Sequence, residues 1–207
     1  MKLMAGVLLC VSTVAMADNG ADLAFATGEM NHDKVSQWTM ERLVTLKLPE
    51  KCWAKVADKK NMGHTLWSNH ARTIQHIAHA MTGDDWSALE SQSANSKEDN
   101  QKLVDKLVKD FAPKFHLTVI VDGDDCDASG NAMWLKYVSQ TLSALEHYPP
   151  KSGKAMVTIH ADGASKTVKT DVSKDGATFT IIGPKDREPS GWGNDVDNPI
   201  KRVSTKG

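Results

Sequence analysis

The sequence predicts an α+β protein, in which a helical N-terminal half packs on a small mixed sheet. One observation is an apolar β-branched run at residues 115–121, followed by an amphipathic helix over 131–148 and a second apolar run at 155–161. Another is that helical periodicity dominates the chain before Pro113. A strand, a helix and a strand in this order predict one right-handed βαβ crossover, with parallel strands that are adjacent or one place apart.

The C-terminal part of the sheet is predicted from turn signals. Asp162-Gly163 and Lys174-Asp175-Gly176 separate three short β-rich segments, at 155–161, 166–172 and 177–182. Three strands joined by tight turns predict a C-terminal β-meander. After Gly183-Pro184 the chain is rich in proline, glycine and charge.

The ends of the chain set the expected domain limits. Residues 1–17 begin with a basic residue, continue with a short apolar run and end in Ala15-Met16-Ala17, which is typical of a secretory signal peptide cut after Ala17. We therefore expect a soluble, exported protein, periplasmic or extracellular, with a single domain over 18–184. The apolar run is shorter than the roughly 20 residues of a spanning helix, so we expect no membrane insertion. Residues 185–207 are expected to form an irregular or partly disordered tail, anchored by Trp192 and Ile200.

The helical half contains a segment in which histidines suggest a metal site. Over residues 65–81, helical periodicity places His70 on the apolar face and His76 and His79 on the opposite one. A His-x-x-His pair without a nearby glutamate or third ligand does not match a zinc-hydrolase motif. We expect His76 and His79 to be solvated and His70 to be more buried. Residues 34–48 either form a helix or end as a strand before Pro49.

Two cysteines remain after the signal peptide with Cys10 is removed. In an exported protein, Cys52 and Cys126 are expected to form a disulfide that ties the helical half to the segment after the first strand. Closing so long a loop stabilises the fold by about 4 kcal/mol in the chain-entropy model.

Charge argues against one class of partner. The chain carries 25 lysines and arginines and 26 acidic residues, with a formal net charge of −1. Because the basic residues form no stripe, we expect no binding to nucleic acid or to an anionic membrane surface.

The loop between the first strand and the following helix is the candidate binding site. Five oxygen-bearing side chains lie within eight residues: Asp122, Asp124, Asp125, Asp127 and Ser129. Their structural interpretation is that they accept backbone N–H groups at the turn and the helix start, while Cys126 pins the loop. A pinned loop is also a good binding surface, because rigidity lowers the ordering cost of recognition.

Two resemblances suggest other chemistry for this loop. Asp125, Asp127 and Ser129 with Gly130 resemble the opening of an EF-hand loop, which implies calcium, although Lys136 stands where that loop has its bidentate glutamate. An apolar strand followed by Asp122-Gly123-Asp124 resembles the first motif of haloacid-dehalogenase-type phosphatases, which implies an aspartyl nucleophile. Asp125-Cys126 follows where that family usually has Thr or Val.

No complete catalytic set is present, so we expect a non-enzymatic binding or interaction protein without a cofactor, such as an inhibitor, an immunity-type protein or a scaffold. Its partner is expected to be another protein. The alternative is a metal-dependent hydrolase that uses the acidic loop 122–129 and a histidine. If the loop holds a cation, the expected ligands are Asp125, Asp127 and Ser129.

Overall fold

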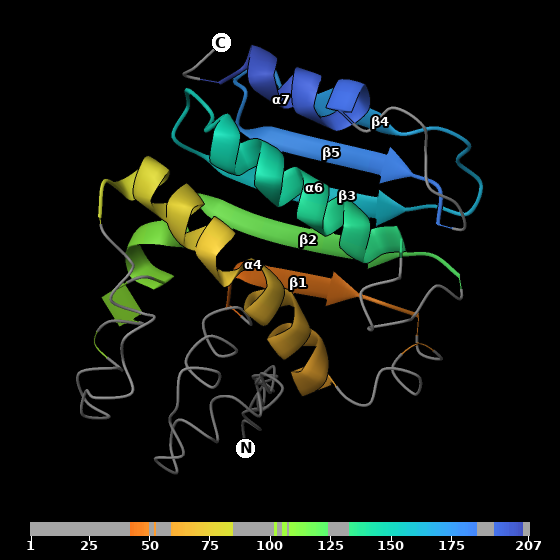
Figure 1. Cartoon of the computed structure of the whole chain (residues 1–207), viewed down its shortest axis with the longest axis horizontal. Helices are drawn as coiled ribbons and strands as arrows, with labels where there is room; N and C mark the ends of the chain where they lie inside the picture. Colours follow the sequence, from red (N-terminus) through yellow and green to blue (C-terminus); the bar gives the residue numbers. More distant parts are fainter. Residues whose placement is uncertain are drawn as a thin grey trace, which may run out of the picture.

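A five-stranded mixed sheet forms the centre of the computed structural model, which describes residues 42–49, 52, 59–84, 102, 105–106, 108–123, 133–185 and 193–204. The sheet order is β1-β2-β3-β5-β4. All neighbouring strands are parallel except β4, which is antiparallel to β5 (Figure 1). The strands are β1 (Val44–Lys47), β2 (Phe115–Val121), β3 (Ala155–Ala161), β4 (Lys169–Val172) and β5 (Thr178–Gly183).

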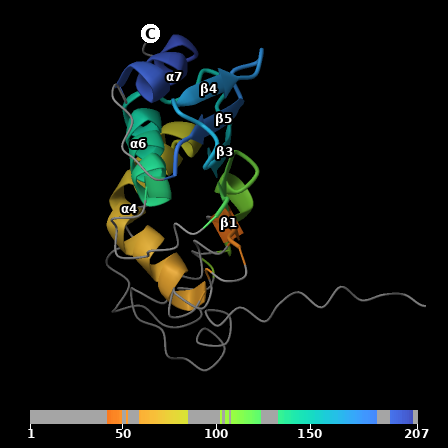
Figure 2. The same ribbon diagram turned by 90° about the vertical axis from the view of Figure 1, so that its right-hand side faces the viewer.

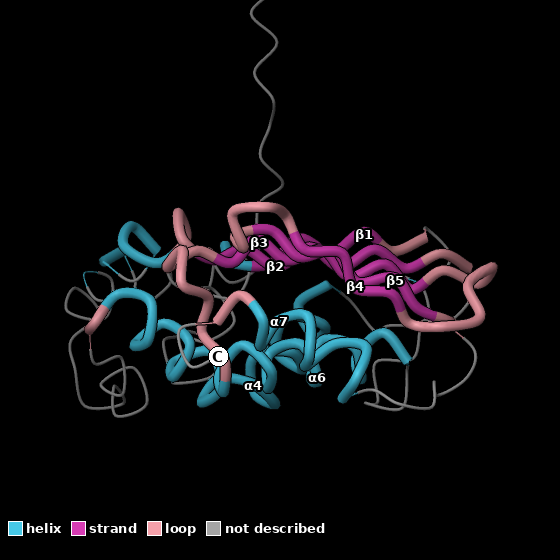
Figure 3. Tube along the Cα trace, turned by 90° about the horizontal axis from the view of Figure 1, so that it is seen from above, coloured by secondary structure: helices cyan, strands magenta, loops and turns pink. Residues whose placement is uncertain are grey.

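The helices lie on one face of this sheet, so the described residues form two layers (Figures 2 and 3). These helices are α4 (Lys59–Thr82), α6 (Met133–His147) and α7 (Asn198–Arg202). The α+β class is therefore confirmed. Among the described helices, none has the length and apolar character needed to cross a membrane.

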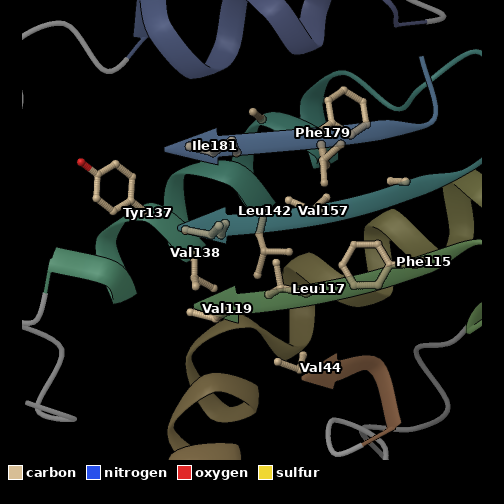
Figure 4. Packing of buried hydrophobic residues seen from close by; sticks show 14 of the residues in the cluster. Val44, Phe115, Leu117, Val119, Tyr137, Val138, Leu142, Val157, Phe179 and Ile181 are labelled. Carbon is tan, nitrogen blue, oxygen red and sulfur yellow. The ribbon is translucent and has the colours of Figure 1, made fainter. Parts of the chain in front are cut away.

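The core forms between the sheet and the helices because each central strand alternates buried and partly exposed residues. In β2, Phe115, Leu117 and Val119 are fully buried. Leu142 of α6 packs in the same cluster (Figure 4). Complete burial of each such side chain contributes about 1.5–3 kcal/mol, so the alternation largely determines which face the helices cover.

The expected parallel, adjacent pairing of the two strands around a helix is confirmed, and the structure contains a second strand-helix-strand unit. Strands β2 and β3 are adjacent and parallel, with Phe115 opposite Ala155 and Val121 opposite Ala161. Strand β1 is parallel to β2, and α4 connects the two. Of the two expectations for residues 34–48, the strand ending is the one found, over 44–47.

The expected C-terminal meander is wrong. Strand β5 lies between β3 and β4, paired in parallel with β3 and antiparallel with β4. The physical reason is burial, because parallel pairing puts Phe179 and Ile181 of β5 into the core at 0% exposure. The more polar β4 contains no fully buried residue and suits the edge of the sheet.

The expectation of an irregular tail is also wrong for the described residues 193–204. They form a single π-helical turn, η3 (Gly193–Asp197), followed by α7. Val196 and Ile200 are fully buried, and Ser204 forms a β-bridge with Pro150. Apolar spacing of four residues in a short helix explains this anchoring, whereas Trp192 lies outside the described residues.

The amino edge of the sheet, where β2, β3 and β5 begin, is closed by packing and backbone bonds. The rings of Phe111 and Phe115 stack with centroids 5.1 Å apart, and both residues are fully buried. Ala155 N donates to Lys114 O at 2.7 Å, and Lys114 Nζ donates to Met81 O at 2.8 Å. The described contacts at this edge therefore stabilise the fold.

The histidine prediction on α4 is confirmed. His76 and His79 are exposed and His70 is half-buried, which lowers the pKa of the His70 imidazole because burial disfavours the charged ring. His76 Nδ1 lies 2.6 Å from Glu146 Oε1 of α6, so this histidine joins the two helices across their exposed side.

Candidate functional site at the carboxyl edge of the sheet

Polar side chains gather where β2, β3 and β5 end side by side. We call this set the carboxyl edge; its described members are Asp122, Gly123, His160, Asp162, Gly163 and Lys185. The parallel ladder continues past the strands, since Asp122 N donates to Ala161 O at 3.0 Å and Asp162 N donates to Gly183 O at 2.9 Å. The edge is therefore held in register by the sheet, at the position where open α/β sheets bind ligands.

Asp122 and His160 form a close pair across β2 and β3. Asp122 Oδ2 lies 2.6 Å from His160 Nε2, and the two side chains are 57% and 33% exposed. The carboxylate accepts the ring N–H, which orients the imidazole and fixes its tautomer when it is neutral. Such a pair can bind a polar group of a partner, transfer a proton or support metal ligation.

Asp162 organises the turn that follows β3. Its Oδ1 accepts the N–H of Ala164 at 2.8 Å, and its carbonyl oxygen accepts the N–H of Ser165 at 3.2 Å. This is an Asx-type turn, which explains why an aspartate precedes Gly163 here. One carboxylate oxygen is thus used structurally at this position.

Lys185 extends across the two glycines of the edge. A Cβ atom added to Gly163 would lie 2.6 Å from Lys185 Cε, and one added to Gly123 would overlap the Lys185 ammonium. Gly123 also has a φ of 92°, a conformation that other residues rarely adopt. Both glycines are needed for the lysine to lie in this position.

Tyr137 of α6 holds the chain that leads into Lys185. Its hydroxyl donates to Pro184 O at 3.1 Å, and Figure 4 shows the ring beyond the arrowhead of β5. Burial raises the pKa of the Tyr137 phenol, so the hydroxyl stays protonated and remains a donor. A Cβ atom at Gly183 would overlap this hydroxyl, which explains the glycine that ends β5.

Cys52 reaches the same edge from the helical half of the chain. It is fully buried, and its Sγ lies 3.5 Å from the carbonyl oxygen of Gly123. Gly123 is three residues before Cys126 in the sequence, which lies outside the described residues. The Cys52–Cys126 disulfide therefore stays a prediction.

Of the five residues expected in the acidic loop, only Asp122 is among those the structure describes. Asp124, Asp125, Asp127 and Ser129 lie outside the described residues, and so does the calcium-ligand set expected among them. Within the described ranges, no group of three His, Cys, Asp or Glu side chains is placed to hold a metal ion.

Three residues of the edge were missed by sequence reasoning: His160, Asp162 and Lys185. A signal for Asp162 exists, because β2 and β3 share the pattern Thr-x-x-x-Asp-Gly, at residues 118–123 and 158–163. The register pairs Thr118 with Thr158, so the two Asp-Gly dipeptides emerge side by side. No local pattern marks Lys185, because it depends on β5 pairing in parallel with β3.

Comparison with protein-family models, with curated proteins and with solved structures finds no match.

Proposed function

We propose that this protein is an exported, non-enzymatic binding protein, of an inhibitor, immunity or scaffold type, that recognises another protein through the carboxyl edge. The observation that carries the proposal is the meeting of Asp122, His160 and Lys185 at the ends of adjacent strands. These side chains supply an acceptor, an imidazole and an ammonium at least partly open to solvent. They stand on a buried, hydrogen-bonded sheet.

Rigidity favours recognition by this edge. The ladder beyond the strands and the Tyr137–Pro184 hydrogen bond fix the backbone before any partner arrives. Little ordering entropy is then lost on binding, so a few polar contacts can give useful affinity. Exposed polar groups on a fixed backbone also favour specificity, because a partner that leaves them unpaired loses affinity.

Export and the disulfide form part of the same proposal. The expected mature chain begins at Asp18, and Cys52 and Cys126 are expected to be bonded in it. Mass spectrometry of the protein recovered from its native host should show a chain without residues 1–17, two hydrogens lighter unreduced than reduced. An intact signal segment, or two free thiols under native export, contradicts this part.

Site-specific photo-crosslinking tests the binding proposal. A photo-reactive amino acid in place of the exposed Ala164, beside the carboxyl edge, should give a discrete protein adduct in the native host. The matched control places the same group at the exposed Lys154 of the amino edge. Each adduct is identified by mass spectrometry, and the partner is then purified for measurement of Kd.

The expected result is an adduct at position 164 that is lost with Asp122→Asn/His160→Gln and absent at position 154. Equal adducts at both positions, or an adduct at 164 that survives the double substitution, would contradict recognition by this edge.

A metal-dependent hydrolase is the second candidate, favoured by the 2.6 Å Asp122–His160 contact. A carboxylate that orients a histidine is common around metal ligands and general bases. Metal analysis of the purified mature protein, with thermal melts in calcium, magnesium, zinc or chelator, tests it. Stoichiometric metal and a chelator-sensitive Tm that His160→Gln abolishes would favour the hydrolase over the binding protein.

A further inference from the structure

We propose that Lys185, with the backbone N–H groups of Gly123 and Gly163, forms an oxyanion-binding subsite, so that the ligand of the carboxyl edge carries a carboxylate or phosphate group. This inference rests on the proposed function and specifies the chemistry of its ligand. The supporting observation is the lysine held across two glycines at the ends of adjacent strands.

The Lys185 side chain lies directly over the two glycines. Lys185 Cδ and Cε lie 3.2 and 3.0 Å from the place of a Cβ atom at Gly123, and 3.2 and 2.6 Å from that at Gly163. An alanine at either position would push the lysine away. Lys185 is half-buried, and its ammonium lies beside the backbone of both glycines.

The nearby carboxylates already have other partners. Asp122 Oδ2 is engaged by His160 at 2.6 Å, and Asp162 Oδ1 accepts the N–H of Ala164. Among the residues the structure describes, the Lys185 ammonium makes no hydrogen bond or ion pair. An ammonium with open donor positions beside exposed backbone is a binding group for an anion.

The glycines supply further donors. Asp122 N and Asp162 N are used in the ladder, whereas Gly123 N–H and Gly163 N–H donate to no other residue in the described ranges. Because Lys185 Nζ lies close to the Cβ positions of both glycines, an oxyanion bound by Lys185 would lie close to their backbone nitrogens. Ammonium and backbone N–H groups together are the usual donors for carboxylates and phosphates.

Amide NMR of the full mature chain with inorganic phosphate or acetate tests the subsite. At constant ionic strength, phosphate should shift the Gly123 and Gly163 resonances in a saturable manner. Lys185→Gln should weaken this binding at least about tenfold, as expected for loss of a charge-assisted contact. Lys154→Gln, at the amino edge, removes the same charge and should leave it unchanged.

One further variant tests the subsite without substituting Lys185. Gly163→Ala should displace the lysine and weaken phosphate binding. The acetate series distinguishes the two sources, since acetate saturating at lower concentration than phosphate assigns a carboxylate ligand and the reverse order assigns a phosphate ligand.

Shifts at the two glycines that fail to saturate, or that persist in Lys185→Gln, would overturn the subsite. The crosslinking comparison of positions 164 and 154 is separate from this measurement. A partner found at 164 without phosphate or acetate binding at the glycines therefore refutes only the oxyanion chemistry, whereas no edge-dependent adduct refutes the binding function.

Discussion

The amino edge and the carboxyl edge of the sheet differ in the side chains that lie there. At the amino edge, Phe111 stacks on Phe115 with both rings buried, and the Lys114 ammonium is capped by the carbonyl of Met81. At the carboxyl edge, the Asp122–His160 pair and Lys185 are at least partly exposed. Two stacked, fully buried rings thus lie where β2 starts, whereas the Asp122–His160 pair and Lys185 lie where the parallel strands end.

Because of this difference, we expect the amino edge to contribute to the stability of the fold and the carboxyl edge to contribute to recognition. Burial of large rings stabilises the fold but offers a partner little, whereas exposed ions contribute little to folding and can bind. The Tyr137 hydroxyl fixes the backbone of the carboxyl edge through its hydrogen bond to Pro184 O, so the polar side chains of this edge need not stabilise the fold. Substitutions at the two edges should therefore have separable effects.

The largest expected effect is at the amino edge. Phe115→Ala removes a fully buried, stacked ring and should lower the free energy of unfolding by about 3–5 kcal/mol. His160→Gln at the carboxyl edge loses only a partly exposed contact and should cost less than about 1 kcal/mol. Urea denaturation of both variants checks this. Similar losses would remove the distinction between the edges.

The second-largest effect is expected where Tyr137 contacts Gly183 and Pro184, next to the carboxyl edge. Gly183→Ala should cost about 1–3 kcal/mol, because its methyl group overlaps the Tyr137 hydroxyl. Tyr137→Phe removes the bond to Pro184 O and should cost about 1 kcal/mol. The double variant should be more stable than the sum of the single effects predicts, because loss of the hydroxyl relieves part of the overlap. Simple additivity in urea denaturation would count against this contact.

A smaller effect is expected in the pH dependence of stability. Burial lowers the pKa of His116, at the start of β2, below its unfolded value of about 6.5. The unfolded chain then binds more protons, so this contribution is complete above about pH 6.5 and is lost as pH falls towards the folded pKa. His116→Gln should flatten the decline in Tm between pH 7 and 5, and His70→Gln should do the same. An unchanged slope in both variants would contradict burial as the cause.

The smallest effect is expected on the exposed side of the helices. His76 and Glu146 are 54% and 28% exposed, so their coupling should be about 0.2–1 kcal/mol and weaken with salt. A double-mutant cycle with alanine at both positions measures it. A coupling well above this range would show that the helix layer, and not only the core, depends on ion pairs.

Strands with strong local patterns could be predicted from the sequence. The observed bounds of β2 and β3 match those that the sequence predicts, because the alternation of apolar residues places one face in the core. The position of β5 could not be predicted, since a sheet with β4 next to β3 and a sheet with β5 next to β3 satisfy the same local pattern. Only burial of Phe179 and Ile181 against the helices selects the parallel arrangement.

The candidate site could be predicted in location but not in composition. An apolar strand followed by Asp122 and Gly123 indicated the end of β2. The contribution of His160 required the register of β3 against β2, and that of Lys185 required the pairing of β5. These contacts join residues far apart in the chain, so no single local motif contains them.

The most direct test of the carboxyl edge as the recognition site compares the same charge change at the two edges of the sheet. Asp122 lies at the carboxyl edge, and the exposed Asp175 lies in the turn before β5, at the amino edge. Titration calorimetry with the crosslinked partner gives Kd for Asp122→Asn and Asp175→Asn. We predict at least about tenfold weaker binding for Asp122→Asn, as for loss of a charged contact, and unchanged binding for Asp175→Asn. Equal effects of the two substitutions, or loss only with Asp175→Asn, would contradict recognition by the carboxyl edge.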